Sequence, residues 1–253
     1  MTSIAFWWRI VRLTNQLLRG LLISVTSFAR GEQHHRHAII RSWSREILHR
    51  AGVEVRTVGF PLDADKPVTL VANHVSFADI FALNTQHACH FIAKSELKSW
   101  PLAGRLLTNV GTIFINRNDR KDTHRLKRVV HELLAAGETV AVFPEGTTSI
   151  GHEVLKFHAS LLEPIVAAEG EVWVVAIRYF RVSDGARTDA AAYIGDMSLL
   201  DTLHAIHVVG GVIAELRFLQ AIQCAGLNRR EVAQRAEALI RASIQSSSFD
   251  NGC

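Results

Sequence analysis

The sequence predicts an α/β fold in which helices flank a mostly parallel, mixed sheet, with a two-helix segment before it. Three observations lead to this fold class. Hydrophobic residues make up 48% of the 253 residues, which is enough to fill a sizeable core and excludes a disordered chain. From residue 53 onward, short β-rich runs alternate with stretches of helical spacing. Glycine and proline separate these runs, and such alternation is typical of helices packed on a parallel sheet.

Residues 5–28 have the pattern of an amphipathic helix. Arg9, Arg12, Gln16 and Arg19 recur at spacings of three and four, so they form one polar stripe. Three arginines make a bilayer span costly, and the pattern favours a helix that lies in the membrane interface. The alternative is a helix packed on the protein's own core. Mostly opposite the stripe lie the apolar residues Phe6, Trp7, Ile10, Leu13, Leu17, Leu21, Val25 and Phe28.

The net charge of +4 is unevenly distributed along the chain. Residues 1–60 contain nine arginines, no lysine and three glutamates, a net charge of +6, and the remaining residues carry −2. This split fits an N-terminal segment that meets an anionic surface, and with no supporting motif the arginines do not indicate a nucleic-acid partner. The cysteines Cys89, Cys224 and Cys253 are widely spaced, which fits a reducing compartment. We therefore expect the chain at the cytoplasmic face of the inner (cell) membrane.

A polar break at residues 31–37 separates the first helix from a second helical stretch at 38–50. His34, His35 and His37 lie in this break, but no fourth metal ligand is placed, and a solvated basic turn is favoured over a metal site. The predicted organisation is a membrane-association segment of residues 1–52, an α/β domain of 53–246 and a flexible tail of 247–253.

The α/β domain is expected to contain eight strands and six helices. The strands are expected at 53–58, 68–72, 90–93, 112–115, 139–143, 172–179, 190–194 and 213–219. The helices are expected at 77–87, 102–109, 122–136, 159–168, 199–208 and 229–246.

The strongest chemical signal follows the strand at 68–72, where His74 precedes Asp79 by five residues. On a continuous helix this spacing leaves the two side chains about 140° apart. They can meet only if His74 lies in the turn before a helix and Asp79 in its first turn. Ser76 is the expected N-cap, because Ser-x-x-Asp has the form of a capping box. The alternative is that Asp79 only caps the helix.

An imidazole oriented by a carboxylate is the arrangement of a general base. The sequence has no G-x-S-x-G nucleophile motif, so the hydroxyl to be activated would belong to a bound substrate.

Two further strand ends carry candidate binding residues. Arg117 ends the strand at 112–115, and an arginine there suits bidentate recognition of phosphate. The strand at 139–143 leads into a turn at 144–146 that is followed by Thr147, Thr148 and Ser149. Backbone N–H groups and hydroxyls in this turn can hold a glycerol phosphate or an oxyanion, and the alternative is a simple tight turn.

Together these segments resemble the lysophospholipid acyltransferase family over roughly residues 50–220. Three motifs carry the resemblance, in the family's order and spacing. They are N-H-x-x-x-x-D (Asn73, His74, Asp79), G-x-I-F-I-x-R (Gly111, Ile113, Phe114, Ile115, Arg117) and F-P-E-G-T (Phe143, Pro144, Glu145, Gly146, Thr147). Lys94 lies in an A-K-S-E-L segment that is often found between the first two motifs.

The resemblance implies an O-acyltransferase of phospholipid biosynthesis. His74 would deprotonate the acceptor hydroxyl, which attacks an acyl thioester, while Asp79 orients the imidazole. Acyl carrier protein or coenzyme A would carry the acyl group, and no further cofactor is implied. The partners would be membrane lipids, and the acceptor expected first is 1-acyl-glycerol-3-phosphate, giving phosphatidic acid. Substrate-binding residues carried over by position are Asn73, Lys94, Arg117, Glu145, Gly146 and Thr147.

Three departures from the family pattern bear on the acceptor. Thr148 replaces a basic residue, His158 stands where lysine is common, and Val174 replaces a proline. The F-P-E-G-T-T-S form is similar to the branch that contains lyso-ornithine lipid acyltransferases, so a lyso-ornithine lipid is the second expected acceptor. A non-catalytic membrane-lipid binding protein and a thioesterase or esterase are the two competing function classes.

Overall fold

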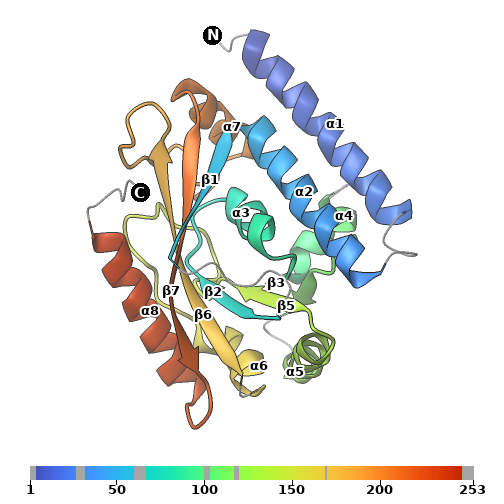
Figure 1. Ribbon diagram of the computed structural model, residues 1–253, viewed down its shortest axis with the longest axis vertical. Helices are drawn as coiled ribbons and strands as arrows, with labels where there is room; N and C mark the ends of the chain where they lie inside the picture. Colours follow the sequence, from blue (N-terminus) through green and yellow to red (C-terminus); the bar gives the residue numbers. More distant parts are fainter. Residues whose placement is uncertain are drawn as a thin grey trace.

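The structure is a computed structural model that describes residues 4–26, 32–59, 67–99, 103–116, 120–168 and 170–246. Figure 1 shows helices on both faces of a twisted sheet. The helices are α1 (Ile4–Thr26), α2 (Gln33–Ala51), α3 (Ala78–Gln86), α4 (Ala103–Asn109), α5 (Arg120–Ala135), α6 (Glu163–Val166), α7 (Leu199–Val208) and α8 (Arg229–Gln245), with short 3-10 helices η1 (Ser95–Ser99) and η2 (Ala159–Leu161). The strands are β1 (Val53–Val58), β2 (Thr69–Ala72), β3 (Cys89–Lys94), β4 (Ile113–Ile115), β5 (Thr139–Val142), β6 (Glu171–Arg181) and β7 (Val212–Gln223).

The described strands form one seven-stranded sheet in the order β1-β7-β6-β2-β5-β3-β4. The β6–β7 pair is antiparallel, and the other neighbouring pairs are parallel. The predicted α/β class with a mostly parallel mixed sheet is thus confirmed. Parallel neighbours end at the same edge of the sheet, so the loops after β2, β5 and β3 are brought together there.

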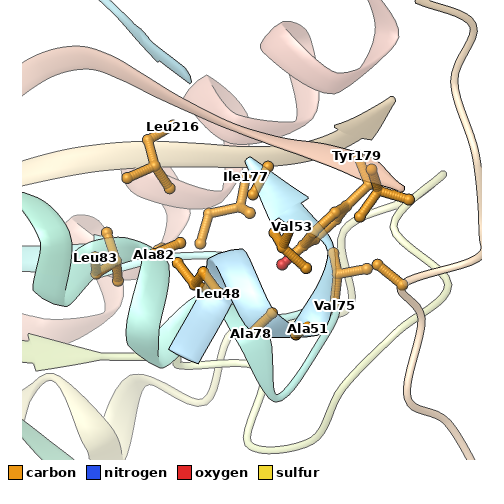
Figure 2. Close-up of a cluster of buried hydrophobic side chains, with 14 of the residues drawn as sticks. Leu48, Ala51, Val53, Val75, Ala78, Ala82, Leu83, Ile177, Tyr179 and Leu216 are labelled. Carbon is orange, nitrogen blue, oxygen red and sulfur yellow. The ribbon is translucent and has the colours of Figure 1, made fainter. Parts of the chain in front are cut away.

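The core lies in two layers, one on each face of the sheet. One layer contains apolar side chains of α1, α2, α3 and α7, and the other contains those of α5, α6 and α8. Figure 2 shows part of the first layer, where Leu48 and Ala51 of α2 lie beside Ala78, Ala82 and other residues of the main domain. The second helix of the N-terminal segment is therefore packed into the same core as the sheet.

Two predicted elements of the α/β domain differ in kind from the structure. The run 190–194 is not a strand: Ala191 and Ala192 are buried, but Ala192 N–H donates to the carbonyl of Asp189 in a turn. The run is apolar because it is partly buried, but it is not part of the sheet. The helix expected at 159–168 is split into η2 and α6, and Pro164, which has no N–H to donate, lies in the first turn of α6.

The polar break at 31–37 is shorter than predicted, because α2 begins at Gln33 and includes His34, His35 and His37. His37 Nε2 lies 2.7 Å from Oε2 of Glu138, the residue before β5, and Arg36 also donates to this buried carboxylate. The start of α2 is thus tied to the sheet. Within the described ranges no three His, Cys, Asp or Glu side chains are grouped as metal ligands would be.

The helix α1 runs alongside α2 (Figure 1) and buries one narrow face against α2, α4 and α7. Gly20 allows the close approach, since a Cβ at this position would lie 2.4 Å from the indole of Trp43. The predicted polar stripe is divided: Gln16 is buried, Arg9 donates to the carbonyl of Ala51, and Arg12 and Arg19 are exposed. None of the described helices has both the length and the hydropathy that a bilayer span requires.

Candidate active site

The site begins where β2 ends. All four residues of β2 are buried, and Asn73 and His74 follow directly. Asn73 is itself buried, and its side-chain amide donates to the carbonyl of Ile177 at 3.0 Å and accepts from the N–H of Ile177 at 2.7 Å. These two hydrogen bonds join the end of β2 to β6, so Asn73 fixes the backbone from which His74 projects.

His74 and Asp79 meet as the five-residue spacing requires. His74 lies in the turn before α3, Asp79 lies in its first turn, and Nδ1 of His74 is 2.9 Å from Oδ2 of Asp79. Asp79 is fully buried, whereas the side chain of His74 keeps 18% of its surface exposed. The carboxylate only accepts hydrogen bonds, so Nδ1 carries the proton and Nε2 has the free lone pair. The N-cap, however, is Phe77 and not Ser76.

The Asp79 carboxylate is held by the loop that it closes. Its Oδ2 accepts the backbone N–H of Val75 at 2.7 Å and that of Ser76 at 2.9 Å. The side chain thereby turns back toward His74, and the helix starts at Ala78, where the N–H contacts the hydroxyl of Ser76 at 3.2 Å. The capping role predicted for Asp79 and its role beside the histidine are thus performed by one oxygen.

Tyr179 supplies a further donor that the sequence motifs did not predict. Its hydroxyl donates to Oδ1 of Asp79 at 2.6 Å from β6, 100 residues further along the chain. The available signal was a tyrosine at the end of the predicted strand 172–179, because a buried tyrosine hydroxyl usually has a polar partner.

The ring of His74 stacks on Phe143, the first residue after β5. The two ring centroids are 4.1 Å apart and the planes are inclined by 9°. Phe143 is in turn stacked on Phe91 of β3 with centroids 5.7 Å apart. The imidazole is therefore fixed at one edge by Asp79 and across one face by an aromatic ring.

The turn after β5 holds the backbone of His74 from both sides. Oε1 of Glu145 accepts the N–H of His74 at 2.8 Å, and the N–H of Ser149 donates to the carbonyl of His74, also at 2.8 Å. The other oxygen of Glu145 accepts the N–H of Leu155 at 3.1 Å. Burial raises the pKa of Glu145 to about 7, although the N–H groups of His74 and Leu155 act in the opposite direction.

The remaining predicted substrate-binding residues lie at the same edge of the sheet or outside the described ranges. Lys94 ends β3 with an exposed side chain. Gly146 has a φ of 70° in the turn after β5, a conformation that favours glycine, and Thr147 next to it is exposed. Arg117 lies outside the residues that the structure describes.

The arrangement of an oriented histidine beside a turn of the F-P-E-G-T type agrees with comparisons to known proteins. The model of the family described as Acyltransferase matches residues 13–179. The chain belongs to this family. It is accordingly an acyltransferase, and the family's matched region includes His74, Asp79 and Glu145.

Curated relatives and a solved structure are similar over most of the chain. A 1-acyl-sn-glycerol-3-phosphate acyltransferase of Neisseria gonorrhoeae is 38% identical over 178 residues, which are 70% of this chain and 69% of that protein. A lyso-ornithine lipid O-acyltransferase of Pseudomonas aeruginosa is 34% identical over 210 residues, 83% of this chain and 79% of that one. The crystal structure of the acyltransferase PlsC from Thermotoga maritima has a TM-score of 0.64 at 19% identity, covering 94% of this chain and 96% of its own, and shows the same fold.

Proposed function

We propose that this acyltransferase moves a fatty acyl group from an acyl thioester to the free hydroxyl of 1-acyl-glycerol-3-phosphate. The observation that carries the proposal is the 2.9 Å hydrogen bond between Nδ1 of His74 and Oδ2 of the buried Asp79. This bond sets the tautomer in which Nε2 is ready to accept a proton. The similarity to enzymes named for this acceptor supports the choice of substrate.

The reaction takes place as a direct transfer. Nε2 of His74 removes the proton of the acceptor hydroxyl while the hydroxyl oxygen attacks the thioester carbonyl. The tetrahedral intermediate collapses with cleavage of the carbon–sulfur bond, and the departing sulfur takes the proton from Nε2. Acyl carrier protein or coenzyme A leaves as the free thiol, and no group of the enzyme is acylated. Asp79 supports the imidazolium that exists between these two steps.

The headgroup of the acceptor is bound at the carboxyl edge of the sheet. Lys94 at the end of β3 and Arg117 after β4 supply positive charge for the phosphate, and Gly146 and Thr147 present backbone and hydroxyl groups. Glu145 acts differently, because both of its oxygens accept backbone N–H groups. Its contribution is to fix His74.

A lyso-ornithine lipid is the second candidate acceptor. Thr148 stands where glycerophosphate-type members carry a basic residue, which weakens the preference for phosphate. The similarity to a lyso-ornithine lipid O-acyltransferase covers a larger part of the chain, 83%, than the similarity to the gonococcal enzyme.

The helix α1 docks the enzyme on the membrane. Its apolar residues Ile4, Trp8, Val11, Leu18, Leu22 and Val25 are spaced along one stripe and are all exposed, on the side opposite to the face that packs on α2. The exposed Arg12 and Arg19 flank this stripe and can reach lipid phosphates. The net charge of +6 over residues 1–60 favours an anionic membrane, and we place the enzyme at the cytoplasmic face of the cell membrane.

The test is acyl transfer in vesicles by the wild type and by His74→Ala, with 1-acyl-glycerol-3-phosphate and a lyso-ornithine lipid offered separately, each with acyl carrier protein and coenzyme A thioesters. We expect His74→Ala to abolish transfer without changing thermal unfolding or vesicle binding. His152→Ala is the matched control. His152 also pairs with an aspartate, Asp189, but both side chains are half-exposed and separate from the His74–Asp79 pair. Appreciable transfer by His74→Ala would contradict the mechanism.

The same assay separates the competing functions. A faster reaction with the lyso-ornithine lipid would assign the second acceptor. Lipid binding without any acyl transfer would indicate a non-catalytic lipid-binding protein, and release of free fatty acid without an acceptor would indicate a thioesterase.

A further inference from the structure

Both oxygens of the Asp79 carboxylate are engaged in hydrogen bonds, but by different parts of the fold. Oδ2 accepts three donors from the loop that it closes, namely His74, Val75 and Ser76. Oδ1 accepts the hydroxyl of Tyr179 at 2.6 Å. The orientation of the carboxylate is therefore set jointly by the loop before α3 and by Tyr179 of β6.

Tyr179 is placed for this contact by the surrounding core. Figure 2 shows its ring among buried apolar side chains, with the hydroxyl oxygen on the side of Val75 and Ala78. The same strand holds Asn73 through the backbone of Ile177, two residues earlier. Strand β6 thus contacts the catalytic loop on each side of His74.

The phenol remains a donor at any working pH. Burial and the charge of Asp79 raise the pKa of Tyr179 well above its ordinary value, and a hydrogen bond with Ser76 acts weakly in the opposite direction. A neutral donor on Oδ1 draws negative charge away from Oδ2. It therefore reduces the strength with which Asp79 stabilises a protonated imidazole.

We propose that Tyr179 is a positioning residue for acyl transfer: its hydroxyl fixes the Asp79 carboxylate so that Oδ2 faces Nδ1 of His74, and it moderates the support that Asp79 gives to the imidazolium. The proposal rests on the function proposed above for His74. Tyr179 of β6 thereby joins the His74–Asp79 pair as a third residue, which acts through Asp79 without touching the substrate.

The direction of the pH effect follows from the charges around His74. Asp79 faces the imidazole from α3, and Glu145 faces its backbone from the turn after β5. Loss of the phenol hydroxyl leaves more charge on Oδ2, which stabilises the protonated imidazole and moves the acidic limb of kcat/KM to higher pH. A stronger donor at the same place moves the limb to lower pH. Glu145 is unchanged in both cases, so a shift reports the Tyr179–Asp79 bond.

The first variant is Tyr179→Phe, which keeps the ring and removes the hydroxyl. Hydrogen bonds to charged groups are usually strong, so we expect kcat to fall at least about tenfold, with KM little changed. The acidic limb is expected to move up by about 0.5 pH unit. The matched control is Tyr193→Phe, since Tyr193 is the other tyrosine of the chain and its side chain is half-exposed. It is expected to keep the wild-type pH profile.

The second protein tests the same bond without removing it. Because the chain contains two tyrosines, growth of the Tyr193→Phe protein on 3-fluorotyrosine places the analogue at position 179 alone. The fluorine makes the phenol more acidic and a stronger donor while the shape is retained, so this protein is expected to fold even if Tyr179→Phe does not. Its acidic limb should move to lower pH, opposite to the shift in Tyr179→Phe.

The outcomes distinguish this proposal from the function on which it rests. A wild-type profile without an acidic limb, or an active His74→Ala, would contradict the role of His74. A normal wild-type limb that stays in place with 3-fluorotyrosine at position 179, or an unchanged limb and kcat in a folded Tyr179→Phe, would overturn the role of Tyr179. Lower thermal stability alone would indicate a packing role and also count against the proposal.

Discussion

The imidazole of His74 lies face to face with the ring of Phe143, with centroids 4.1 Å apart and planes inclined by only 9°. A protonated imidazole over an aromatic face is stabilised by the electrons of the ring. The same contact prevents the imidazole from rotating away from Asp79. Phe143 therefore links the F-P-E-G-T turn to the imidazole of the N-H-x-x-x-x-D segment.

Replacement of Phe143 by leucine should lower kcat by more than a packing defect of similar size elsewhere in the same aromatic stack. Loss of the stacked ring removes about 1 kcal/mol of support for the imidazolium, equivalent to about fivefold in kcat, in addition to a packing defect. Phe91→Leu is the matched comparison, because Phe91 stacks on Phe143 and is also buried. Steady-state kinetics and thermal unfolding of both variants test this. Equal losses of kcat in the two variants would show that only packing matters.

Glu145 should make the stability of the wild type depend on pH. Its folded pKa of about 7 lies above its ordinary value of 4.5, so between these values the folded protein binds a proton that the unfolded chain has released. The free energy of unfolding therefore falls as pH rises through this window and is level above it. In Glu145→Gln this group does not titrate. The stability of the wild type relative to Glu145→Gln should drop by up to about 3 kcal/mol between pH 4.5 and 7.

Urea unfolding of the two proteins across this pH range measures the difference directly. The absolute stability of Glu145→Gln is expected to be lower at acidic pH, because an amide cannot accept backbone N–H groups through both of its polar atoms. If the free energies of unfolding of the two proteins changed with pH in parallel, the raised pKa of Glu145 would be contradicted.

The local part of the site could be predicted from the sequence. The five-residue spacing of His74 and Asp79 allowed a contact only across the start of a helix, and the structure has this arrangement. The N-cap lies one residue later than predicted, at Phe77, although the N–H of Ser76 donates to Asp79 as the predicted capping box requires.

The contacts from β6 could not be predicted in this way. Tyr179 and Ile177 reach the loop after β2 because β6 lies next to β2 in the sheet, and neighbouring strands of this order are not evident from periodicity. Likewise, the spacing of the α1 arginines shows which side chains share a face but not which face meets α2. In the structure the face that contains Gln16 meets α2, so Gln16 is buried, while Trp8 and Leu22 on the other side are exposed.

Asn73 should be more important for stability than other buried amides. Its substitution by alanine leaves the N–H and the carbonyl of Ile177 without the amide, and we expect a loss of about 2–4 kcal/mol. Asn84→Ala is the matched control, because the buried Asn84 has a single described bond of this kind, to the N–H of Cys89. It should lose about 1–2 kcal/mol. Urea unfolding measures both losses. An equal loss in the two variants would show that pairing with both backbone groups of Ile177 gives no more stability than a single such hydrogen bond.

The outward face of α1 should determine vesicle binding without affecting folding. Leu18 and Leu22 are 47% and 63% exposed, so the double variant Leu18→Asp, Leu22→Asp removes apolar surface that the fold does not bury. Insertion of two leucines into lipid is favourable by about 1.5–3 kcal/mol each, and the acidic replacements are repelled by anionic headgroups. Binding to phosphatidylglycerol vesicles should weaken at least about tenfold, measured by co-sedimentation, with no change in thermal unfolding. Val182→Asp, on an exposed apolar residue after β6, is the matched control and should bind normally. Undiminished binding by the double variant would place the membrane contact elsewhere on the protein.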